Sequence, residues 1–456
     1  MQPHWRGNIV KTTLGAIAQA LGLDTTHPNL PITGICTDSR QVAAGNLFVA
    51  LRGATFDGHQ FVDQAAAAGA IALMVETPLS AALPQLQVAN TLSAYQRLGQ
   101  WWRQQCPAKV IAVTGSVGKT TTKEMIAAVL RHYGTVLKTE ANFNNEIGVP
   151  KTLLQLEPHH QFAVIEMGMR ARGEIALLSQ IAQPDVAVIT NVGTAHIGRL
   201  GSREAIAQAK CELLAEMPPG GTAVLNADSP LLLPTAVQVW SGRTITYGLE
   251  GGTLRGIYQP PQTLHVGGRT YTVPLAGAHH ALNFLAALGV LQALDIEGDR
   301  LPLQLALELP GGRGGRYRLE PDILLLDETY NAGLESMVAA LHLLRSLPGQ
   351  RHLAVLGPMR ELGAFSLSFH EQVGATVAQL DLDGLLILDQ GDEGAALAQG
   401  AGRIPTQQFG SHEELVEYLL RELQAGDRLL FKASHAVALD RVVTELRQRW
   451  PKLQSG

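Results

Sequence analysis

Three continuous apolar runs, each ending in glycine, most constrain how this chain can fold. They read KVIAVTG (109–115), FAVIEMG (162–168) and DVAVITNVG (185–193). The runs are apolar throughout instead of alternating, which is typical of parallel strands covered on both faces. Helical patterns separate them, so the sequence predicts an α/β fold built on a parallel sheet. Because ligands bind at the carboxyl ends of such strands, we expect a site among the polar residues that follow.

The chain has 456 residues, which is too long for a single core. Residues 1–106 predict a small α/β domain, with a helix followed by a strand in HQFVDQAAAAGAIALMVE. Residues 107–310 contain the three runs and predict a central parallel-sheet domain. Residues 311–456 alternate apolar runs such as ILLLDE and HLAVLG with helical stretches, which predicts a C-terminal Rossmann-like domain. The glycine-rich LPGGRGGRYR at 309–318 is the expected hinge or linker that introduces this domain.

Composition excludes several classes of protein. A net charge of −5 gives no nucleic-acid-binding footprint, and no apolar run is long enough to cross a membrane. The first residues contain no continuous apolar segment, so we expect no signal peptide. Cys36, Cys106 and Cys211 are scattered, which argues against disulfides or a zinc site and favours a cytoplasmic location.

The first run leads into the loop TGSVGKTT, at residues 114–121. A helical pattern follows, so the context is strand, glycine loop and helix N-terminus, which attracts phosphate oxygens. Lys119 would supply a charge for the β and γ phosphates, and the hydroxyl of Thr120 could reach Mg²⁺. The alternative is a tight strand-to-helix turn with a solvated lysine, which the order of Gly, Lys and Thr disfavours.

Further candidates follow the other two runs. Glu166 ends the second run, where it could hold magnesium, and His196 follows the third. A helix with Ser202 as its expected N-cap then carries Lys210. Taken singly, a glutamate at a strand end is a surface residue about as often as not, a histidine is more often structural, and a lysine on a helix usually faces solvent. A functional role for Glu166 and His196 is favoured because both follow strands of the sheet that carries the phosphate loop.

These features resemble the Mur ligase family, whose phosphate loop has the pattern T-G-[ST]-x-G-K-T-[TS], as residues 114–121 do. The supporting strings spread over the whole chain: NFNNEIGVPKTLL (142–154), EMGMRARGEI (166–175), NVGTAHIGRLGSREAIAQAKCELL (191–214), LLLDETYNAGLESM (324–337) and LGPMRELGAFS (356–366). The resemblance implies an ADP-forming ligase of peptidoglycan synthesis that uses ATP and Mg²⁺. Its expected substrates are UDP-N-acetylmuramoyl-tripeptide and D-alanyl-D-alanine, joined through an acyl phosphate, and we expect a cytoplasmic monomer.

The resemblance also implies roles for individual residues. Catalytic roles are expected for Lys119, Glu166, His196, Lys210 and Arg313, with Arg316 a substitute for Arg313. ATP contacts are expected from Thr114, Gly115, Ser116, Val117, Gly118, Lys119, Thr120, Thr121, Asn283, Arg313, Asp327, Tyr330 and Asn331. Metal ligands would be Thr120, Glu166, His196 and Lys210, the last as a carbamate. The sugar nucleotide would contact Ser39, Arg40, Asp57 and His59 at its UDP end, and Asn142, Asn144 and Asn145 at its peptide.

Three short segments depart from the family pattern, all in the last domain. Pro358 stands where the family has aspartate, Gly333-Leu334 where it has Asn-Pro, and Ala433 and His435 where it has glycine and arginine. A proline offers neither a carboxylate nor an N–H, and His435 is no permanent cation. The alternatives are another ligase on the same scaffold, resembling folylpolyglutamate synthetase or the Mur ligase that adds the third peptide residue, or a non-catalytic nucleotide-binding paralogue.

Overall fold

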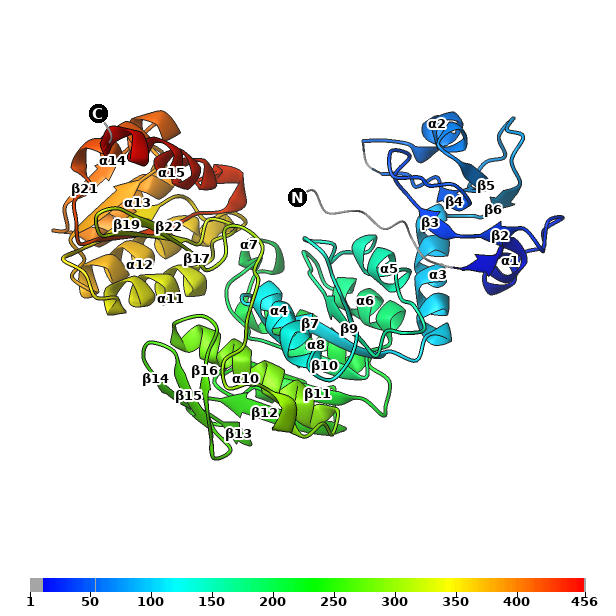
Figure 1. Cartoon of the computed structure of the whole chain (residues 1–456), viewed down its shortest axis with the longest axis horizontal. Coiled ribbons are helices and arrows are strands. Elements are labelled where there is room, and N and C mark those ends of the chain that lie inside the picture. The colour runs from blue at the N-terminus through cyan, green and yellow to red at the C-terminus, as the bar shows by residue number, and fades with distance from the viewer. Residues whose placement is uncertain (1–10, 54, 455–456) are drawn as a thin grey trace.

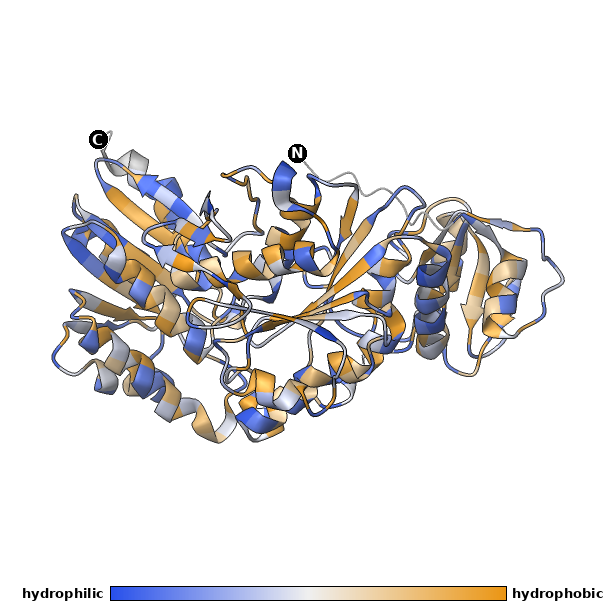
Figure 2. Cartoon of the chain, turned by 90° about the horizontal axis from the view of Figure 1, so that it is seen from below, coloured by the Kyte–Doolittle hydropathy of each residue, from blue (hydrophilic) through white to orange (hydrophobic). Residues whose placement is uncertain are grey.

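The computed structural model describes residues 11–53 and 55–454, which form three lobes in chain order (Figure 1). Each lobe has a sheet of its own, and the N-terminal and C-terminal lobes lie on opposite sides of the central one. The strands of these sheets are among the most apolar segments of the chain (Figure 2). The α/β architecture with parallel sheets is the one that the sequence predicts.

The N-terminal lobe is built on a four-stranded parallel sheet in the order β3-β4-β5-β6. Its elements are β1 (Thr12–Thr13), α1 (Leu14–Leu21), β2 (Pro31–Ile32), β3 (Gly34–Cys36), β4 (Asn46–Val49), η1 (Gly58–Phe61), α2 (Val62–Ala67), β5 (Ala70–Val75) and β6 (Gln85–Gln87). The predicted helix and strand are α2 and β5. Gly69 between them has a φ of 110°, a conformation that glycine adopts without strain.

Helix α3 (Thr91–Gln105) connects the N-terminal lobe to the central lobe. Asn90 caps its start by accepting a backbone N–H with its side chain. Near its end, Trp102 donates its ring N–H to a backbone carbonyl of the central lobe at 2.9 Å. Arg103 pairs with Asp185 at 2.9 Å. These contacts fix the two lobes to one another.

The central lobe is built on a seven-stranded parallel sheet in the order β13-β12-β11-β10-β7-β9-β8. Its strands are β7 (Lys109–Thr114), β8 (Val136–Lys138), β9 (Phe162–Glu166), β10 (Val186–Ile189), β11 (Thr222–Asn226), β12 (Arg243–Gly248) and β13 (Leu254–Arg255). The three glycine-ended runs form β7, β9 and β10, with β7 in the middle. Their carboxyl ends therefore lie side by side, as expected.

Helices cover both faces of this sheet. They are α4 (Lys119–Leu130), α5 (Gly148–Leu153), α6 (Glu174–Ala182), α7 (Ile197–Leu200), α8 (Arg203–Ala215), α9 (Leu232–Ala236) and α10 (Ala278–Ala293). Ile111 and Val113 pack in the core with α4 and α10, whereas Val110 and Ala112 pack on the opposite face with α6 and α8. Both faces of the strand are thus buried, which explains why its sequence is apolar throughout.

A small antiparallel sheet, which is not among the predicted elements, follows the central sheet. Its strands are β14 (Ile257–Gln259), β15 (Thr263–Val266) and β16 (Arg269–Thr272). Several of its side chains are exposed and polar, so the sequence carries no apolar run there. The 3₁₀ turn η2 (Gly298–Arg300) precedes the linker to the last lobe.

The C-terminal lobe has a six-stranded sheet in the order β17-β18-β22-β19-β20-β21, in which β17 alone of these strands is antiparallel. Its strands are β17 (Gly315–Leu319), β18 (Ile323–Asp327), β19 (Arg351–Leu356), β20 (Gly384–Ile387), β21 (Thr406–Gln408) and β22 (Asp427–Lys432). Its helical elements are α11 (Leu334–Ser346), η3 (Gly363–Phe365), α12 (Ser366–Gln379), α13 (Asp392–Ala401), α14 (His412–Glu422), η4 (His435–Val437) and α15 (Asp440–Gln454). None of the helices described in the chain is long and apolar enough to cross a membrane.

Candidate active site

The loop between β7 and α4 has the geometry of an anion-binding turn. Gly118 has a φ of 82°, which favours glycine. A Cβ atom at Gly115 would lie 1.8 Å from Oγ1 of Thr190, so only glycine fits there. Lys119 is the first residue of α4. The N–H groups of the loop and the positive end of the helix dipole therefore share one space, as a phosphate site requires.

Neighbouring strand ends brace this loop. The hydroxyl of Thr114 donates to a backbone carbonyl just after β9 at 2.9 Å. The hydroxyl of Ser116 accepts a backbone N–H from the segment after β10 at 2.8 Å. The backbone N–H of Val117 donates to the side chain of Asn191 at 3.0 Å. The loop is therefore held in shape by the sheet edge.

Lys119 lies over the loop and is half-buried. Its ammonium donates to the carbonyl of Gly115 at 2.8 Å. Burial lowers the pKa of Lys119, Glu166 opposes this shift, and Arg313 adds to it. The same ammonium is placed to bind an anionic group in the loop.

Glu166 and Thr120 form the polar edge of the sheet beside the loop. The hydroxyl of Thr120 donates to Oε2 of Glu166 at 2.8 Å, and the amide of Asn144 donates to Oε1 at 2.8 Å. Each carboxylate oxygen keeps a further lone pair, and such oxygens are the ligands that Mg²⁺ prefers. In the described part of the chain, no three His, Cys, Asp or Glu side chains gather to hold a metal alone. A metal here would need hydroxyl, phosphate or carbamate oxygens as well.

His196 is the residue before α7 and has a φ of 66°, which is unusual for a residue other than glycine. Its Nδ1 lies 2.7 Å from Oε2 of Glu361 in the C-terminal lobe. Burial and the charge of Lys119 lower the pKa of His196, Glu361 opposes this, and Lys210 lowers the pKa further. A lowered pKa favours the neutral ring, which is the form that binds metals.

Lys210 lies in α8, whose predicted N-cap is confirmed by a hydrogen bond from a backbone N–H to the hydroxyl of Ser202 at 3.1 Å. The side chain of Lys210 is buried, and its amine has no hydrogen bond or ion pair among residues 11–53 and 55–454. Burial and the charge of Lys119 hold its pKa well below the ordinary value. It does not line the cavity described below. The lowered pKa favours the neutral amine over the ammonium.

An arginine of the linker stacks with two aromatic side chains of the C-terminal lobe. The guanidinium of Arg313 lies 3.8 Å from the centre of the Tyr330 ring, which stacks on His435 with 5.5 Å between ring centres. Asp327, at the end of β18, accepts a hydrogen bond from the hydroxyl of Thr329 at 2.6 Å. Arginine stacks on aromatic faces in this way, so the two rings and the guanidinium form one stack.

Two further residues complete this edge of the C-terminal lobe. Asn331 is exposed, and its carbonyl accepts a hydrogen bond from Lys432 at 2.9 Å. Arg316 lies in β17, is exposed and lines neither of the cavities described next. Arg313 therefore remains the better candidate for contact with phosphate.

A cavity of about 810 Å³ lies between the central and C-terminal lobes. The predicted site residues that line it are Ser116, Val117, Gly118, Lys119, Thr120, Thr121, Asn142, Asn144, Asn145, Glu166, His196, Asn283, Arg313, Tyr330 and Asn331. A second cavity of about 540 Å³ adjoins it at Thr120, Asn142, Arg313 and Tyr330, and is also lined by Asp327. The structure thus brings together most of the residues expected to contact ATP and the metal.

Asn283 lies in α10 and is buried behind the loop. The hydroxyl of Thr122 donates to its Oδ1 at 3.1 Å. That oxygen also lies 2.9 Å from where a Cβ atom of Gly118 would be, so the side chain packs closely on the loop. Its expected contact with adenine stays a prediction.

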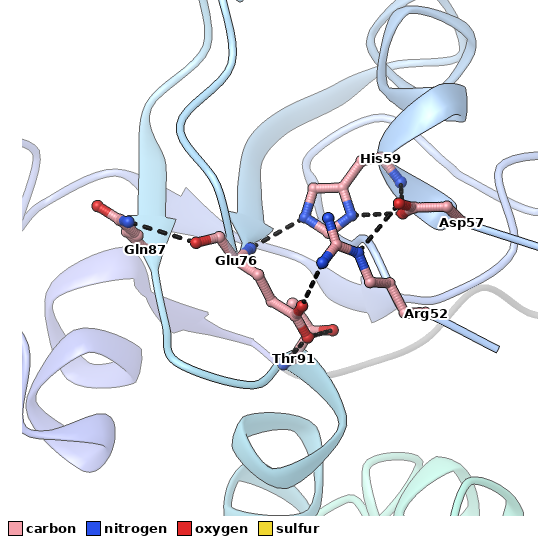
Figure 3. A network of polar contacts seen from close by, with 6 residues as sticks. All are labelled: Arg52, Asp57, His59, Glu76, Gln87 and Thr91. Carbon is pink, nitrogen blue, oxygen red and sulfur yellow. Dashed lines mark hydrogen bonds and ion pairs between the residues drawn. The ribbon is translucent and has the colours of Figure 1, made fainter.

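Asp57 and His59 belong to a polar network of the N-terminal lobe (Figure 3). Nδ1 of His59 lies 2.6 Å from Asp57, and its Nε2 accepts the backbone N–H of Glu76 at 2.9 Å. Arg52 bridges Asp57 at 3.0 Å and Glu76 at 3.2 Å, and Glu76 also accepts two hydrogen bonds from Thr91 at the start of α3. Both ring nitrogens of His59 are thus engaged by the fold, and its expected contact with substrate stays a prediction.

Ser39 and Arg40 lie after β3 and do not reach the cavity. The hydroxyl of Ser39 donates to Gln64 at 3.0 Å. The guanidinium of Arg40 is mostly exposed and pairs with Asp38 at 2.8 Å. The four N-terminal candidates therefore form a separate region from the phosphate loop.

Two glutamates that the sequence analysis did not single out hold the C-terminal lobe against the central lobe. Glu335, in the first turn of α11, accepts the backbone N–H of Thr194 at 2.8 Å and its hydroxyl at 3.1 Å. Glu361 contacts His196. Both line the cavity. An acidic residue in the first turn of a helix is a common local feature, so the sequence gives no sign that it reaches another lobe.

The three departures from the family pattern follow strands β18, β19 and β22 of the C-terminal lobe, and of their residues Gly333 lines the main cavity and His435 the second. The carbonyl of Pro358 accepts the backbone N–H of Ser434 at 3.1 Å. Ala433 is buried against Gly357, and Gly333-Leu334 begins α11. These residues change the polar groups that follow the strands, whereas strands β18, β19 and β22 themselves remain regular.

Known family models match all three regions of the chain. "Mur ligase family, catalytic domain" matches residues 31–106, "Mur ligase middle domain" matches 113–291, and "Mur ligase, glutamate ligase domain" matches 315–435. The matches include the phosphate loop from Thr114 onward, Glu166, His196 and Lys210.

Matches to individual relatives cover nearly the whole chain. It is 53% identical to the UDP-N-acetylmuramoyl-tripeptide–D-alanyl-D-alanine ligase of Synechocystis, over 93% of this chain and 94% of the relative. It resembles the crystal structure of MurF from Acinetobacter baumannii with a TM-score of 0.90 and 33% identity, covering 97% of this chain and all of the other. The MurF ligase of Thermotoga maritima in complex with ADP has a TM-score of 0.82 and 31% identity, over 92% and 98% of the two chains. The chain therefore belongs to the Mur ligase family.

Proposed function

We propose that this Mur ligase joins D-alanyl-D-alanine to UDP-N-acetylmuramoyl-tripeptide and forms ADP, as a step of peptidoglycan precursor synthesis. One observation carries the proposal: Lys119, Thr120 and Glu166 of the central lobe share a cavity with Arg313 and Tyr330 from the linker and C-terminal lobe. The names of the relatives at 53% and 36% identity support the choice of substrates.

Phosphate binding falls to the loop and its neighbours. The loop N–H groups and Lys119 would hold the β and γ phosphates of ATP, and Arg313 would reach the γ-phosphate from the linker. The hydroxyl of Thr120, the carboxylate of Glu166 and the ring of His196 would hold Mg²⁺. When bound, Mg²⁺ would neutralise the charge of the phosphates so that a second anion can approach.

The reaction requires two anions to meet. The terminal carboxylate of the tripeptide attacks the γ-phosphorus, which releases ADP and leaves an acyl phosphate. The amine of D-alanyl-D-alanine then attacks the acyl carbon, and phosphate departs as the amide forms. Lys119 and Arg313 contribute positive charge at the site of transfer. Enclosure of the cavity by both lobes would exclude water, which would otherwise hydrolyse the acyl phosphate.

Lys210 would act as a carbamate. Only an unprotonated amine reacts with CO₂, and burial and Lys119 keep the pKa of Lys210 well below its ordinary value. The product is an anionic oxygen donor, which suits Mg²⁺ better than an amine does. Conversion to an anion would also remove the repulsion between Lys210 and Lys119.

The remaining candidates take roles that follow from family membership. Adenosine would contact Asn283, Asp327, Tyr330 and Asn331, and the muramoyl-peptide would contact Asn142, Asn144 and Asn145. The UDP end would lie near Ser39, Arg40, Asp57 and His59 in the N-terminal lobe. The monomeric state and the cytoplasmic location remain predictions.

The test is the formation of ADP by the purified chain with ATP, Mg²⁺, UDP-tripeptide and D-alanyl-D-alanine. We expect steady ADP release that requires both peptide substrates, and a product whose mass equals that of the UDP-pentapeptide. ADP release without either substrate, or none with both, would contradict the proposal. A panel of other amines and UDP-peptides tests the alternative ligases, and absence of turnover with all of them would indicate a non-catalytic paralogue.

A further inference from the structure

Lys123 is a buried lysine to which the proposed reaction gives no role. It lies on α4 one turn after Lys119, and its side chain is wholly buried. Its ammonium donates to the backbone carbonyl of Thr139 at 2.8 Å. It also lies 3.1 Å from Oε1 of Glu124 and 3.8 Å from Oε2 of Glu166. A buried ammonium is costly unless acceptors and opposite charges surround it, and here they do.

Helix α4 approaches the carboxylate of Glu166 with two side chains. Thr120 and Lys123 are three residues apart and therefore lie on the same face of the helix. The hydroxyl of Thr120 donates to Oε2 of Glu166, which is also the oxygen nearest Lys123. Asn144 donates to the other carboxylate oxygen, Oε1. The carboxylate is thus held between α4 and the segment after β8.

The backbone of Glu166 is tied into the same arrangement. Its N–H donates to the hydroxyl of Thr139 at 3.0 Å, while the carbonyl of Thr139 accepts the hydrogen bond from Lys123. Thr139 is completely buried. Lys123 therefore stabilises Glu166 through its side chain directly and through its backbone by way of one residue.

Glu124 has a second lysine partner, Lys138, so Lys123 can also pair with Glu166. Lys138 forms an ion pair with Glu124 from the other side, so two lysines and two glutamates balance one another. In the described part of the chain, Lys123 is the one cation within 4 Å of Glu166. Lys138 contacts Glu124 and not Glu166.

We propose that Lys123 is a positioning residue for the metal site, which holds the carboxylate of Glu166 oriented toward the cavity before Mg²⁺ binds. The inference rests on the proposed role of Glu166 as a metal ligand. Partners that orient a ligand are expected to matter for metal affinity nearly as much as the ligand does. Lys123 thereby makes the metal site rigid from within the core, since its side chain is wholly buried and does not line the cavity.

The test compares three variants by binding of Mn²⁺, followed by electron paramagnetic resonance in the presence of ADP. Lys123→Met removes the charge next to Glu166. Lys138→Met is the matched control, since it removes one lysine from the same cluster without touching Glu166. Lys123→Met combined with Glu124→Gln restores the balance of charge, so this double variant folds even if the single variant does not. Melting temperatures report folding separately.

We expect Lys123→Met to weaken Mn²⁺ binding by at least about tenfold, with the same loss in the double variant and less than about twofold in Lys138→Met. Mn²⁺ affinity within twofold of the parent in the double variant would overturn the inference, because Lys123 would then serve Glu124 alone. An equal loss in Lys138→Met would overturn it too, since net charge would explain the effect. A parent protein that binds Mn²⁺ in this pattern but forms no ADP would contradict the proposed function and not the role of Lys123.

Discussion

Nδ1 of His196 lies 2.7 Å from Oε2 of Glu361, although 165 residues separate them in the chain. Glu361 also lies 3.5 Å from Arg199, and its backbone carbonyl accepts the N–H of Gly198 at 3.3 Å. All of these contacts join α7 of the central lobe to the C-terminal lobe, and Figure 1 shows α7 where the two lobes meet. A candidate metal ligand of the central lobe is therefore oriented by a side chain of the C-terminal lobe.

We expect Glu361→Ala to loosen the contact between these lobes and to lower kcat by about tenfold, because His196 loses the partner that orients its ring. Without nucleotide, the variant should show faster proteolysis within the linker at 309–318 and a larger radius of gyration in X-ray scattering. Glu371→Ala, an exposed glutamate of α12, is the control and should match the parent. Unchanged proteolysis and kcat in Glu361→Ala would show that the contact has no such role.

Lys119→Ala should lower kcat by at least about 100-fold, because the variant loses the charge that stabilises the transferring phosphate. The assay is ADP release with both peptide substrates. Lys109→Ala is a matched control, since Lys109 begins the same strand β7, is exposed and pairs with Asp185. Removing an exposed ion pair changes the stability of a protein by little, so Lys109→Ala should fold and keep nearly full activity. Turnover retained in Lys119→Ala would contradict the assignment of the phosphate loop.

The central sheet and its loop were predictable from sequence because their signals are local. Strands such as β7 are buried on both faces, so they read as continuous apolar runs, and the loop needs Gly115, Gly118 and Lys119 in a fixed order. The small sheet from β14 to β16 was not predicted, because its short strands alternate and expose polar residues.

Contacts between lobes were not predictable in the same way. Glu335 and Glu361 each sit in ordinary local surroundings, and their partners lie 141 and 165 residues away in the chain. Burial of Lys123 and Lys210 also depends on packing between helices and the sheet. A lysine on a helix is usually solvent-facing, so no pattern in the sequence separates these two from the rest.

Lys210→Ala should lose at least about 100-fold in kcat, because a carbamate would be lost as a metal ligand. Acetate or formate should restore part of the activity by supplying the missing carboxylate. In the parent protein, ¹³C-bicarbonate should give a carbamate carbon signal that Lys210→Ala lacks. Lys123→Met should keep this signal, since Lys123 is paired with carboxylates and is not a free amine. Full activity of Lys210→Ala without additive, or persistence of the signal, would rule out the carbamate.

His279, which lines the main cavity, should make the stability of the protein depend on pH. Burial, and then the charge of Lys432, lower the pKa of His279 to about 4. The unfolded chain binds this proton near pH 6.5, whereas the folded chain does so only near pH 4. The unfolded state therefore binds more protons between these values, and stability falls as pH decreases through the window. This residue contributes about 2 kcal/mol of stability at pH 7 that is lost by pH 5.

Calorimetry at pH 7 and pH 5 checks this expectation. His279→Gln should narrow the difference in melting temperature between the two pH values by roughly 5 °C, because glutamine has no proton to gain. His27→Gln is the control, since His27 is exposed in the N-terminal lobe and should leave the difference unchanged. If both variants narrowed the difference in melting temperature equally, the pH dependence would come from the overall charge of the protein and not from His279. No narrowing in His279→Gln would show that the folded protein accommodates the protonated ring, which burial and the charge of Lys432 argue against.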